Sequence, residues 1–210
     1  MSLGNKIQTA HPQSTLNVVN HPMIFIADFT ERTKLLPVKR HVEITSFQQQ
    51  DPAGTALMDS LIVHNDSQYD VEVVQLDDNI FNNILTKRVH PNQHCEGCFS
   101  IIDKQPLQWI AVMELKDCSS NSPYKEEHAF KAKRQIYNVI QDLRTRGIIT
   151  TERLYGLISW PQVKTSFNSM ITGADIIAAT RYKKYTGVTF YGSNEAYIIN
   201  KDEVSPVIVS

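Results

Sequence analysis

The amino-acid sequence predicts a mixed α/β fold, in which helices flank a mixed central sheet and the N-terminal portion is rich in β-strands. Short apolar segments with the alternation of strands recur through the first 76 residues. Apolar residues fill the run from Trp109 to Leu115 almost completely, which is typical of a strand covered on both faces. An amphipathic helix and another apolar strand follow that run. The chain has 210 residues, 41% of them hydrophobic, which is enough to bury a core.

Turn-forming clusters separate the apolar segments of the N-terminal third, so we expect each segment to be a strand. The expected strands are Met23 to Phe29, Val38 to Phe47, Asp59 to Val63 and Tyr69 to Leu76. A short helix is expected from about Asp77 to Lys87, because Leu76, Ile80 and Ile84 recur at helical spacing.

The middle of the chain predicts a hairpin and then a crossover connection. Cys98 to Ile102 and Leu107 to Leu115 are the two expected strands, with a turn at Asp103-Lys104-Gln105-Pro106. The next helix begins near Ser122 and Pro123, suitable first residues, and ends before Gly147. Its apolar stripe comprises Ala129, Ala132, Ile136, Val139, Ile140 and Leu143. A strand from Leu154 to Trp160 completes a strand, helix, strand unit.

The C-terminal part predicts a helix from about Ser166 to Tyr182 and short strands from Val188 to Val209. We therefore divide the chain into a β-rich portion (1–76), a core (77–161) and a C-terminal portion (162–210), which we expect to pack on the same domain. No linker separates these ranges clearly.

Composition excludes several classes of protein. The chain has 21 Lys and Arg against 22 Asp and Glu, so its net charge of -1 gives no overall attraction to a polyanion. No apolar run approaches the roughly 18 to 20 residues that cross a bilayer, so no membrane partner is expected. The N-terminus lacks the pattern of a signal peptide, and the odd set of Cys95, Cys98 and Cys118 suits a reducing compartment. We therefore expect a cytoplasmic protein.

Charged residues stand at one end of the predicted hairpin. A turn centred between Lys104 and Gln105 places Glu96 opposite Met113 and beside Glu114. Alternation along the second strand puts Ile110, Val112, Glu114 and Lys116 on one face. Two carboxylates and an amine thus follow an apolar run, a break of pattern that is typical of functional sites.

Two close carboxylates repel each other unless a cation or a proton compensates. Mg²⁺ or Mn²⁺ suits such a pair, because hard cations take oxygen ligands, here Glu96, Glu114 and the backbone carbonyl of Leu115. Lys116 would orient water or neutralise developing negative charge. Phosphodiester hydrolysis is the reaction that these groups fit.

These residues resemble the PD-(D/E)xK, or restriction-endonuclease-like, nuclease superfamily. Glu96 is similar to its first acid, although aspartate is usual there, and Glu114-Leu115-Lys116 is similar to its E-x-K motif. The resemblance extends over about 77–161, in the order strand, strand, helix, strand. Lys131, Lys133 and Gln135, with Tyr137, resemble the residues of the helix that follows.

The resemblance implies a Mg²⁺- or Mn²⁺-dependent nuclease with Glu96, Glu114 and Lys116 as catalytic residues. Asp77 or Asp78 is a further candidate acid, and Lys131, Lys133, Arg134 and Gln135 are candidate substrate-binding residues. Nucleic acid, with DNA expected, would be the partner, and the family leaves a homodimer open. The alternative is a catalytically inactive module of the same fold that binds nucleic acid or a protein.

Other sites compete for the same segment. Cys95, Cys98 and Cys118 with His90 and His94 suggest zinc, but no second pair of ligands with zinc-site spacing exists, so zinc is not expected. A cysteine nucleophile with His94 or His128 as base lacks an orienting third group. A further basic set is either a phosphate track or solvated surface: Arg144, Arg146, Arg153, Arg181, Lys183 and Lys184, with Tyr182 and Tyr185.

Overall fold

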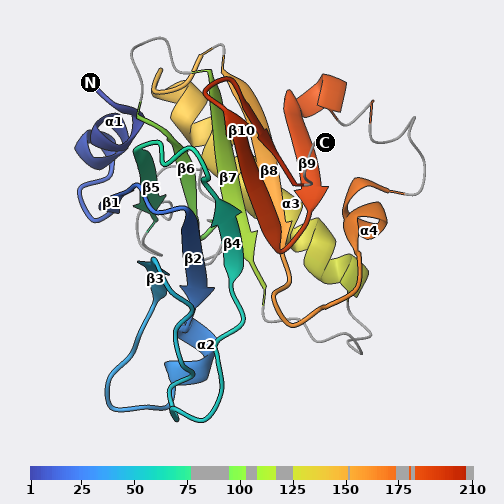
Figure 1. Ribbon diagram of the computed structural model, residues 1–210. Helices are drawn as coiled ribbons and strands as arrows, with labels where there is room; N and C mark the ends of the chain where they lie inside the picture. Colours follow the sequence, from blue (N-terminus) through green and yellow to red (C-terminus); the bar gives the residue numbers. More distant parts are fainter. Residues whose placement is uncertain are drawn as a thin grey trace.

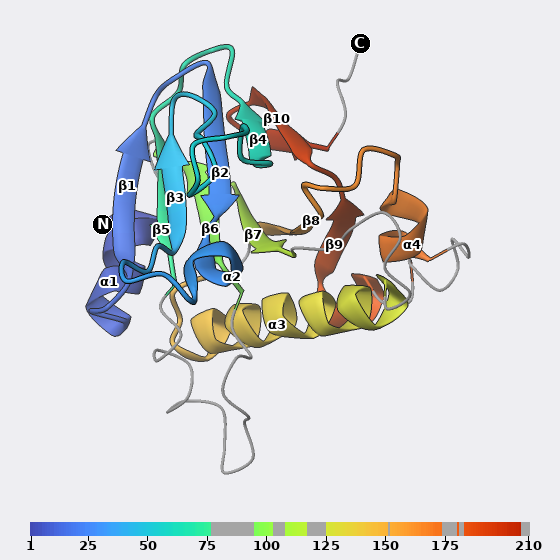
Figure 2. The ribbon, with the colours of Figure 1, turned by 90° about the horizontal axis from the view of Figure 1, so that it is seen from below.

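The computed structural model describes residues 1–76, 95–102, 108–116, 125–150, 152–173, 180 and 183–206. Over these residues the protein has two mixed sheets flanked by few helices, which confirms the predicted mixed α/β class (Figures 1 and 2). Figure 2 shows the layers: α3 lies on one face of the larger sheet, and the smaller sheet lies on the other.

The larger sheet has six strands in the order β1-β5-β6-β7-β8-β9. Its strands are Thr15–Val19 (β1), Val71–Gln75 (β5), Gly97–Ile101 (β6), Trp109–Leu115 (β7), Arg153–Ser159 (β8) and Val188–Gly192 (β9). Pairing is antiparallel from β1 to β7 and parallel from β7 to β9. The parallel pairing of β7 with β8 confirms the predicted crossover through α3.

The smaller sheet has five strands in the order β11-β10-β4-β2-β3. Its strands are Met23–Asp28 (β2), Val42–Thr45 (β3), Leu61–His64 (β4), Glu195–Asn200 (β10) and Glu203–Ser205 (β11). Only β10 and β4 pair in parallel among these described strands. Segments from the two ends of the chain therefore share this sheet, and 1–76 supplies strands to both sheets.

The helices Leu3–Ala10 (α1), Thr30–Thr33 (α2), Lys125–Thr145 (α3) and Asn168–Thr172 (α4) complete the fold, and residues 183–186 are also helical. α1 packs on β1 and β5, α3 on β7 and β8, and α4 on β9. One apolar core lies between these helices and the larger sheet, and a second lies between the two sheets. None of the described helices is long and apolar enough to cross a bilayer.

The central elements follow the sequence pattern closely. The predicted stripe of α3, from Ala129 to Leu143, is buried. Gly147 follows the helix with φ +66°, a conformation that glycine adopts without strain. The predicted helix at 77–87, the hairpin turn at 103–106 and the residues Ser122 and Pro123 lie outside the described part of the chain.

Elsewhere the structure corrects the prediction. The helix expected over 166–182 is not continuous, because α4 ends at Thr172 and Gly173 takes φ +88°. The strand expected at 38–47 is only Val42–Thr45. α1 and β1 were not expected from the sequence. Leu3 and Ile7 are the only large apolar residues of α1 that are buried, so this short helix depends on packing rather than on its own propensity.

A buried polar contact fastens α1 to α3. His11, at the end of α1, places Nε2 2.8 Å from Oδ2 of Asp142, and both side chains are buried. Arg146 donates Nε–H to the same carboxylate at 3.0 Å. Because Asp142 is fully enclosed, these two partners replace the water that its carboxylate would otherwise bind.

We expect Asp142→Ala to lower the free energy of unfolding by about 2 kcal/mol, because His11 would lose its acceptor in a buried position. Urea denaturation measures this change. Arg134→Ala, an exposed position on the same helix, is the matched control and should stay within about 0.5 kcal/mol of wild type. Equal effects of the two substitutions would show that the buried contact does not stabilise the fold.

Candidate active site

The register of β6 and β7 brings Glu96 and Glu114 together. Gly97 pairs with Met113, so Glu96, one residue before β6, lies across from Glu114. On its other side, Glu96 extends the pairing of β6 with β5, because its carbonyl accepts a hydrogen bond from the amide of Leu76 at 3.1 Å. The predicted register, with Glu96 opposite Met113, was therefore wrong by one residue.

That single residue decides which face of the sheet Glu96 occupies. Residues directly opposite each other in antiparallel strands share a face, and a slip of one residue exchanges the faces. Pairing with Met113 would have directed Glu96 toward the smaller sheet, where Met113 packs. The observed register assigns Glu96 and Glu114 to the same face, the one covered by α3.

Glu114 and Lys116 form an ion pair at the end of β7. Ile110 and Val112 belong to the core beneath α3, whereas Trp109, Ala111 and Met113 belong to the core between the sheets. Glu114 continues the first set, as alternation predicted. Its side chain is 0% exposed and pairs with the ammonium of Lys116, which is 18% exposed. This cation compensates a carboxylate that has no access to water.

The electrostatic surroundings keep Lys116 charged. Burial lowers the pKa of Lys116, but the carboxylates of Glu114, Glu96 and Asp28 outweigh burial and raise the pKa overall. Glu114 and Glu96 also help to raise the pKa of the buried thiol of Cys95, after the larger effect of burial. Glu96 and Glu114 thus both raise the pKa of Lys116 and of Cys95. Because its pKa is raised, Lys116 serves as a cation rather than as a base.

Asp28 is the site residue that sequence reasoning missed. It ends β2, after the buried residues Ile24, Phe25, Ile26 and Ala27. Its Oδ1 accepts a hydrogen bond from the amide of Thr30 at 2.8 Å, at the start of α2. An acid at the end of an apolar strand is the same signal that Glu114 gives, but only the packing of the two sheets brings Asp28 to Lys116.

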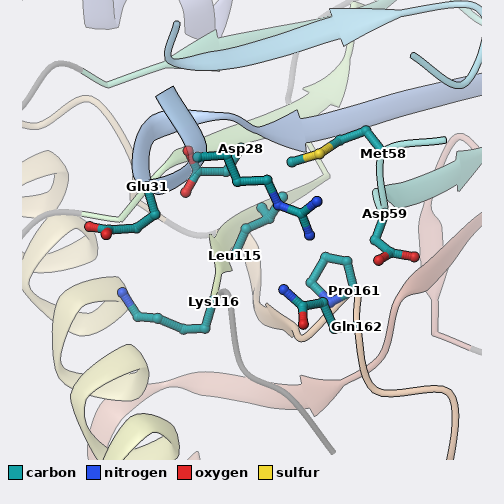
Figure 3. A pocket seen from close by; sticks show the side chains of 9 residues that line it. Asp28, Glu31, Met58, Asp59, Leu115, Lys116, Pro161 and Gln162 are labelled. Atoms are coloured by element: carbon teal, nitrogen blue, oxygen red, sulfur yellow. The ribbon is translucent and has the colours of Figure 1, made fainter. Parts of the chain in front are cut away.

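A small pocket opens where these strands end. Figure 3 shows its lining, with Lys116 extending along the same side of the pocket as Glu31 and with Asp28 nearby. The lining residues are Asp28, Glu31, Arg32, Met58, Asp59, Leu115, Lys116, Pro161 and Gln162. The pocket is therefore lined by residues of β2, of helix α2 and of the end of β7.

α3 does not present the four predicted substrate-binding residues together. Gln135 is buried, Lys133 is half-buried, and Lys131 and Arg134 are exposed. Burial lowers the pKa of Lys133. Adjacent side chains on a helix point about 100° apart, so Arg134 and Gln135 leave α3 in different directions. Only Gln135 faces the sheet from this set.

The other basic candidates have structural partners or lie elsewhere. Arg144 donates to the carbonyl of Thr186 at 2.9 Å, and Arg146 binds Asp142. Lys183 and Lys184 are exposed, whereas Arg181, Tyr182, Asp77 and Asp78 are outside the described residues. Within the described part of this basic set, Arg144 and Arg146 thus make structural contacts, and Lys183 and Lys184 are surface residues.

The cysteines next to the site are enclosed. Cys95 and Cys98 are both buried, and burial raises the pKa of each thiol. A thiol with a raised pKa is a poor nucleophile at neutral pH. Across the described ranges, no group of three or more His, Cys, Asp or Glu side chains is arranged to hold a metal. Cys118, His90 and His94, the remaining zinc candidates, lie in undescribed segments.

Comparison of the chain with protein-family models, with curated proteins and with solved structures gives no match. The resemblance to nucleases therefore depends on the site residues themselves.

Lys116→Met should destabilise the protein by about 3 kcal/mol, because it leaves the enclosed carboxylate of Glu114 without a cation. Glu114→Gln in the same chain should recover part of this loss, since a neutral amide needs no counter-charge. A double-mutant cycle in urea measures the coupling. Lys164→Met, which breaks an exposed pair with Asp59, should cost less than about 1 kcal/mol. Strictly additive effects at 114 and 116 would contradict a coupled pair.

The same pair predicts a dependence of stability on pH. A lysine whose pKa is raised in the folded state stabilises the protein below the pKa of the unfolded chain, about 10.4. The difference in unfolding free energy between wild type and Lys116→Met should be constant from pH 7 to about 9.5. It should shrink as the pH rises through the folded-state pKa. Denaturation curves from pH 7 to 11 test this, and a difference that grew with pH would contradict it.

Proposed function

We propose that this protein is a metal-dependent nuclease with a restriction-endonuclease-like core, and that it hydrolyses phosphodiester bonds in nucleic acid, with DNA as the expected substrate. The observation that carries the proposal is the register that assigns Glu96 and Glu114 to one face at the end of the β6-β7 hairpin, with Lys116 two residues further. The parallel crossover through α3 to β8 supports it.

The chemistry of the donors fits Mg²⁺ or Mn²⁺ better than zinc. Glu96, Glu114 and the carbonyl of Leu115 offer only oxygen atoms, and Mg²⁺ commonly takes one or two carboxylates with water and substrate phosphate. Three carboxylates raise the pKa of Lys116, since Asp28 acts on it together with Glu114 and Glu96. This excess of negative charge would repel a phosphate at the site, and a bound divalent cation would offset that repulsion there.

Each candidate residue of the site would have a distinct role. Glu96 and Glu114 would hold the ion, which when bound stabilises negative charge on the phosphate and activates water. Lys116 keeps its proton, so it would neutralise the charge that develops on the phosphoryl oxygens. Gln135 borders this face of the sheet from α3 and would orient water or phosphate through its amide.

Glu114→Gln should reduce cleavage at least about 100-fold, because it removes one of two carboxylate ligands and keeps the shape of the side chain. Cleavage of plasmid, linear duplex, single-stranded DNA and RNA in Mg²⁺ or Mn²⁺ measures this. Glu203→Gln, an exposed carboxylate on β11, is the matched control and should cut like wild type. If Glu114→Gln retained full activity, another site or a contaminant would be responsible.

A second candidate function is binding without cleavage, in a nuclease-like fold that has lost activity. The complete burial of Glu114 and its pairing with Lys116 favour this reading, because a cation is already present beside the carboxylate. Calorimetric titration with Mn²⁺ distinguishes the two functions. Binding that Glu114→Gln abolishes supports the nuclease, whereas nucleic-acid binding with no metal binding and no cleavage supports the inactive module.

A further inference from the structure

An exposed loop with apolar and cationic side chains follows α2. All six of its residues are exposed, in the sequence Lys34-Leu35-Leu36-Pro37-Val38-Lys39. Leu35 is 90% exposed and Val38 is 73% exposed. Single exposed apolar residues are ordinary, but several within six residues indicate a binding surface. Figure 1 shows the chain between α2 and β3 projecting beyond the ends of β2 and β3. We call these residues the 34–39 loop.

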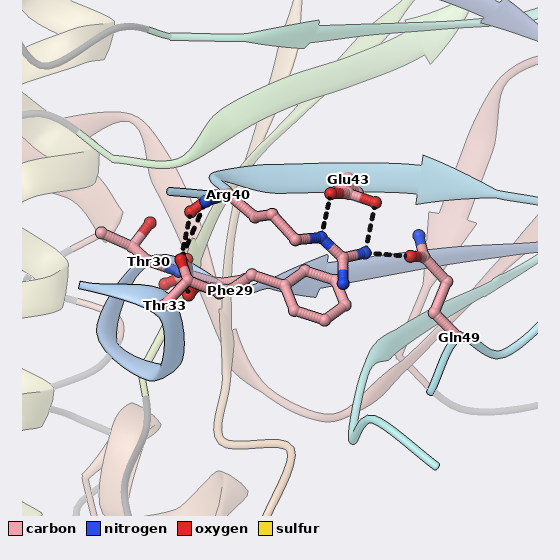
Figure 4. A network of polar contacts seen from close by, with 7 residues as sticks. Phe29, Thr30, Thr33, Arg40, Glu43 and Gln49 are labelled. Carbon is pink, nitrogen blue, oxygen red and sulfur yellow. Dashed lines mark hydrogen bonds and ion pairs between the residues drawn. The ribbon is translucent and has the colours of Figure 1, made fainter. Parts of the chain in front are cut away.

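The base of the 34–39 loop is fastened on both sides. The hydroxyl of Thr33 lies 2.9 Å from the carbonyl oxygen of Phe29 and accepts a hydrogen bond from the amide of Arg40 at 2.8 Å. The guanidinium of Arg40 lies 3.6 Å from the ring centroid of Phe29 and binds both carboxylate oxygens of Glu43 (Figure 4). The loop is therefore held in place before it meets a partner, which reduces the entropy lost on binding.

The 34–39 loop continues directly from the pocket that contains Lys116. Arg32, two residues before the loop, lines that pocket with Lys116. Arg32 and Lys39 pair with no carboxylate in the part of the chain that the structure describes, while Lys34 contacts Glu31 at the surface. Arg32, Lys34 and Lys39 therefore place cations on the loop and at the edge of a pocket that also carries Asp28, Glu31 and Asp59, in a chain whose net charge is only -1.

We propose that the 34–39 loop binds duplex nucleic acid: Arg32, Lys34 and Lys39 contact phosphates, and Leu35 and Val38 enter a groove beside the scissile bond. This inference rests on the proposed nuclease function, because it places the duplex over the pocket of Lys116. Cations beside an apolar wedge are the combination by which proteins bind and deform the minor groove. The loop would supply the attraction that the acidic site lacks.

Duplex binding by the full-length Glu114→Gln chain tests the loop without cleavage. The probe is a fluorescently labelled 20-base-pair DNA duplex, and anisotropy at several salt concentrations gives affinity and salt dependence. Adding Lys34→Gln and Lys39→Gln should weaken binding about 10-fold and reduce the salt slope by about 2, the number of phosphate contacts removed. Adding Leu35→Ser and Val38→Ser should weaken binding several-fold and leave the salt slope unchanged.

Matched controls use the same substitutions at exposed positions elsewhere. Lys183→Gln with Lys184→Gln should change affinity less than about 2-fold, and so should Val18→Ser on the edge strand β1. Because the loop side chains are exposed, all variants should unfold at the temperature of the parent chain. Loop variants that bind duplex as tightly as their parent would overturn the inference.

Two further experiments, cleavage by the loop variants and binding to vesicles, distinguish this inference from its alternatives. If wild type cleaves DNA while loop variants bind and cleave normally, the loop inference fails and the nuclease stands. If binding depends on the loop but wild type never cleaves, the nuclease fails and the loop inference stands. Vesicles containing phosphatidylserine test a lipid surface. Loss of vesicle binding in loop variants without loss of duplex binding would overturn the nucleic-acid assignment, as would the absence of duplex binding by the parent chain.

Discussion

Burial of β7 on both faces is the constraint on which the rest of the structure depends. All seven residues from Trp109 to Leu115 are buried, so neither face of this strand reaches solvent. α3 covers one face and the smaller sheet covers the other (Figure 2). A carboxylate in such a strand loses its hydration, and Glu114 is stable there because Lys116 supplies a counter-charge. The layered fold and the charged site are therefore consequences of the same buried strand.

The smaller sheet contributes to the site as well as to the core. β2 ends at Asp28, which acts on Lys116 together with Glu96 and Glu114. α2 then carries Arg32 to the same pocket, and the exposed 34–39 loop follows. Acidic groups thus gather around Lys116 at the end of β7, while Lys34 and Lys39 belong to the exposed loop. Under the proposed function, this separation would reconcile a chain of near-zero net charge with a polyanionic substrate, because attraction and metal binding would use different residues.

Local periodicity predicted the central elements well. The β6-β7 hairpin, α3 and β8 each appear where apolar spacing indicated them, and the buried stripe of α3 contains the expected residues. Weak local sequence patterns did not predict the elements whose structure depends on packing. The five-residue β1 has no buried residue, and α1 has a largely polar sequence. At 166–182 the helical spacing continued past Gly173, but the backbone of that residue turns away from the helix.

The sequence by itself determined the fold class, the order of the central strands and the candidates Glu96, Glu114 and Lys116, because side-chain alternation and helical spacing are properties of neighbouring residues. The tertiary structure decided which face Glu96 occupies, since one residue of register exchanges the faces and the sequence does not reveal the centre of the turn. It also brought Asp28, at the end of β2, close to Lys116, at the end of β7. These relations depend on contacts between distant segments, and the packing of two sheets and a helix around β7 creates them.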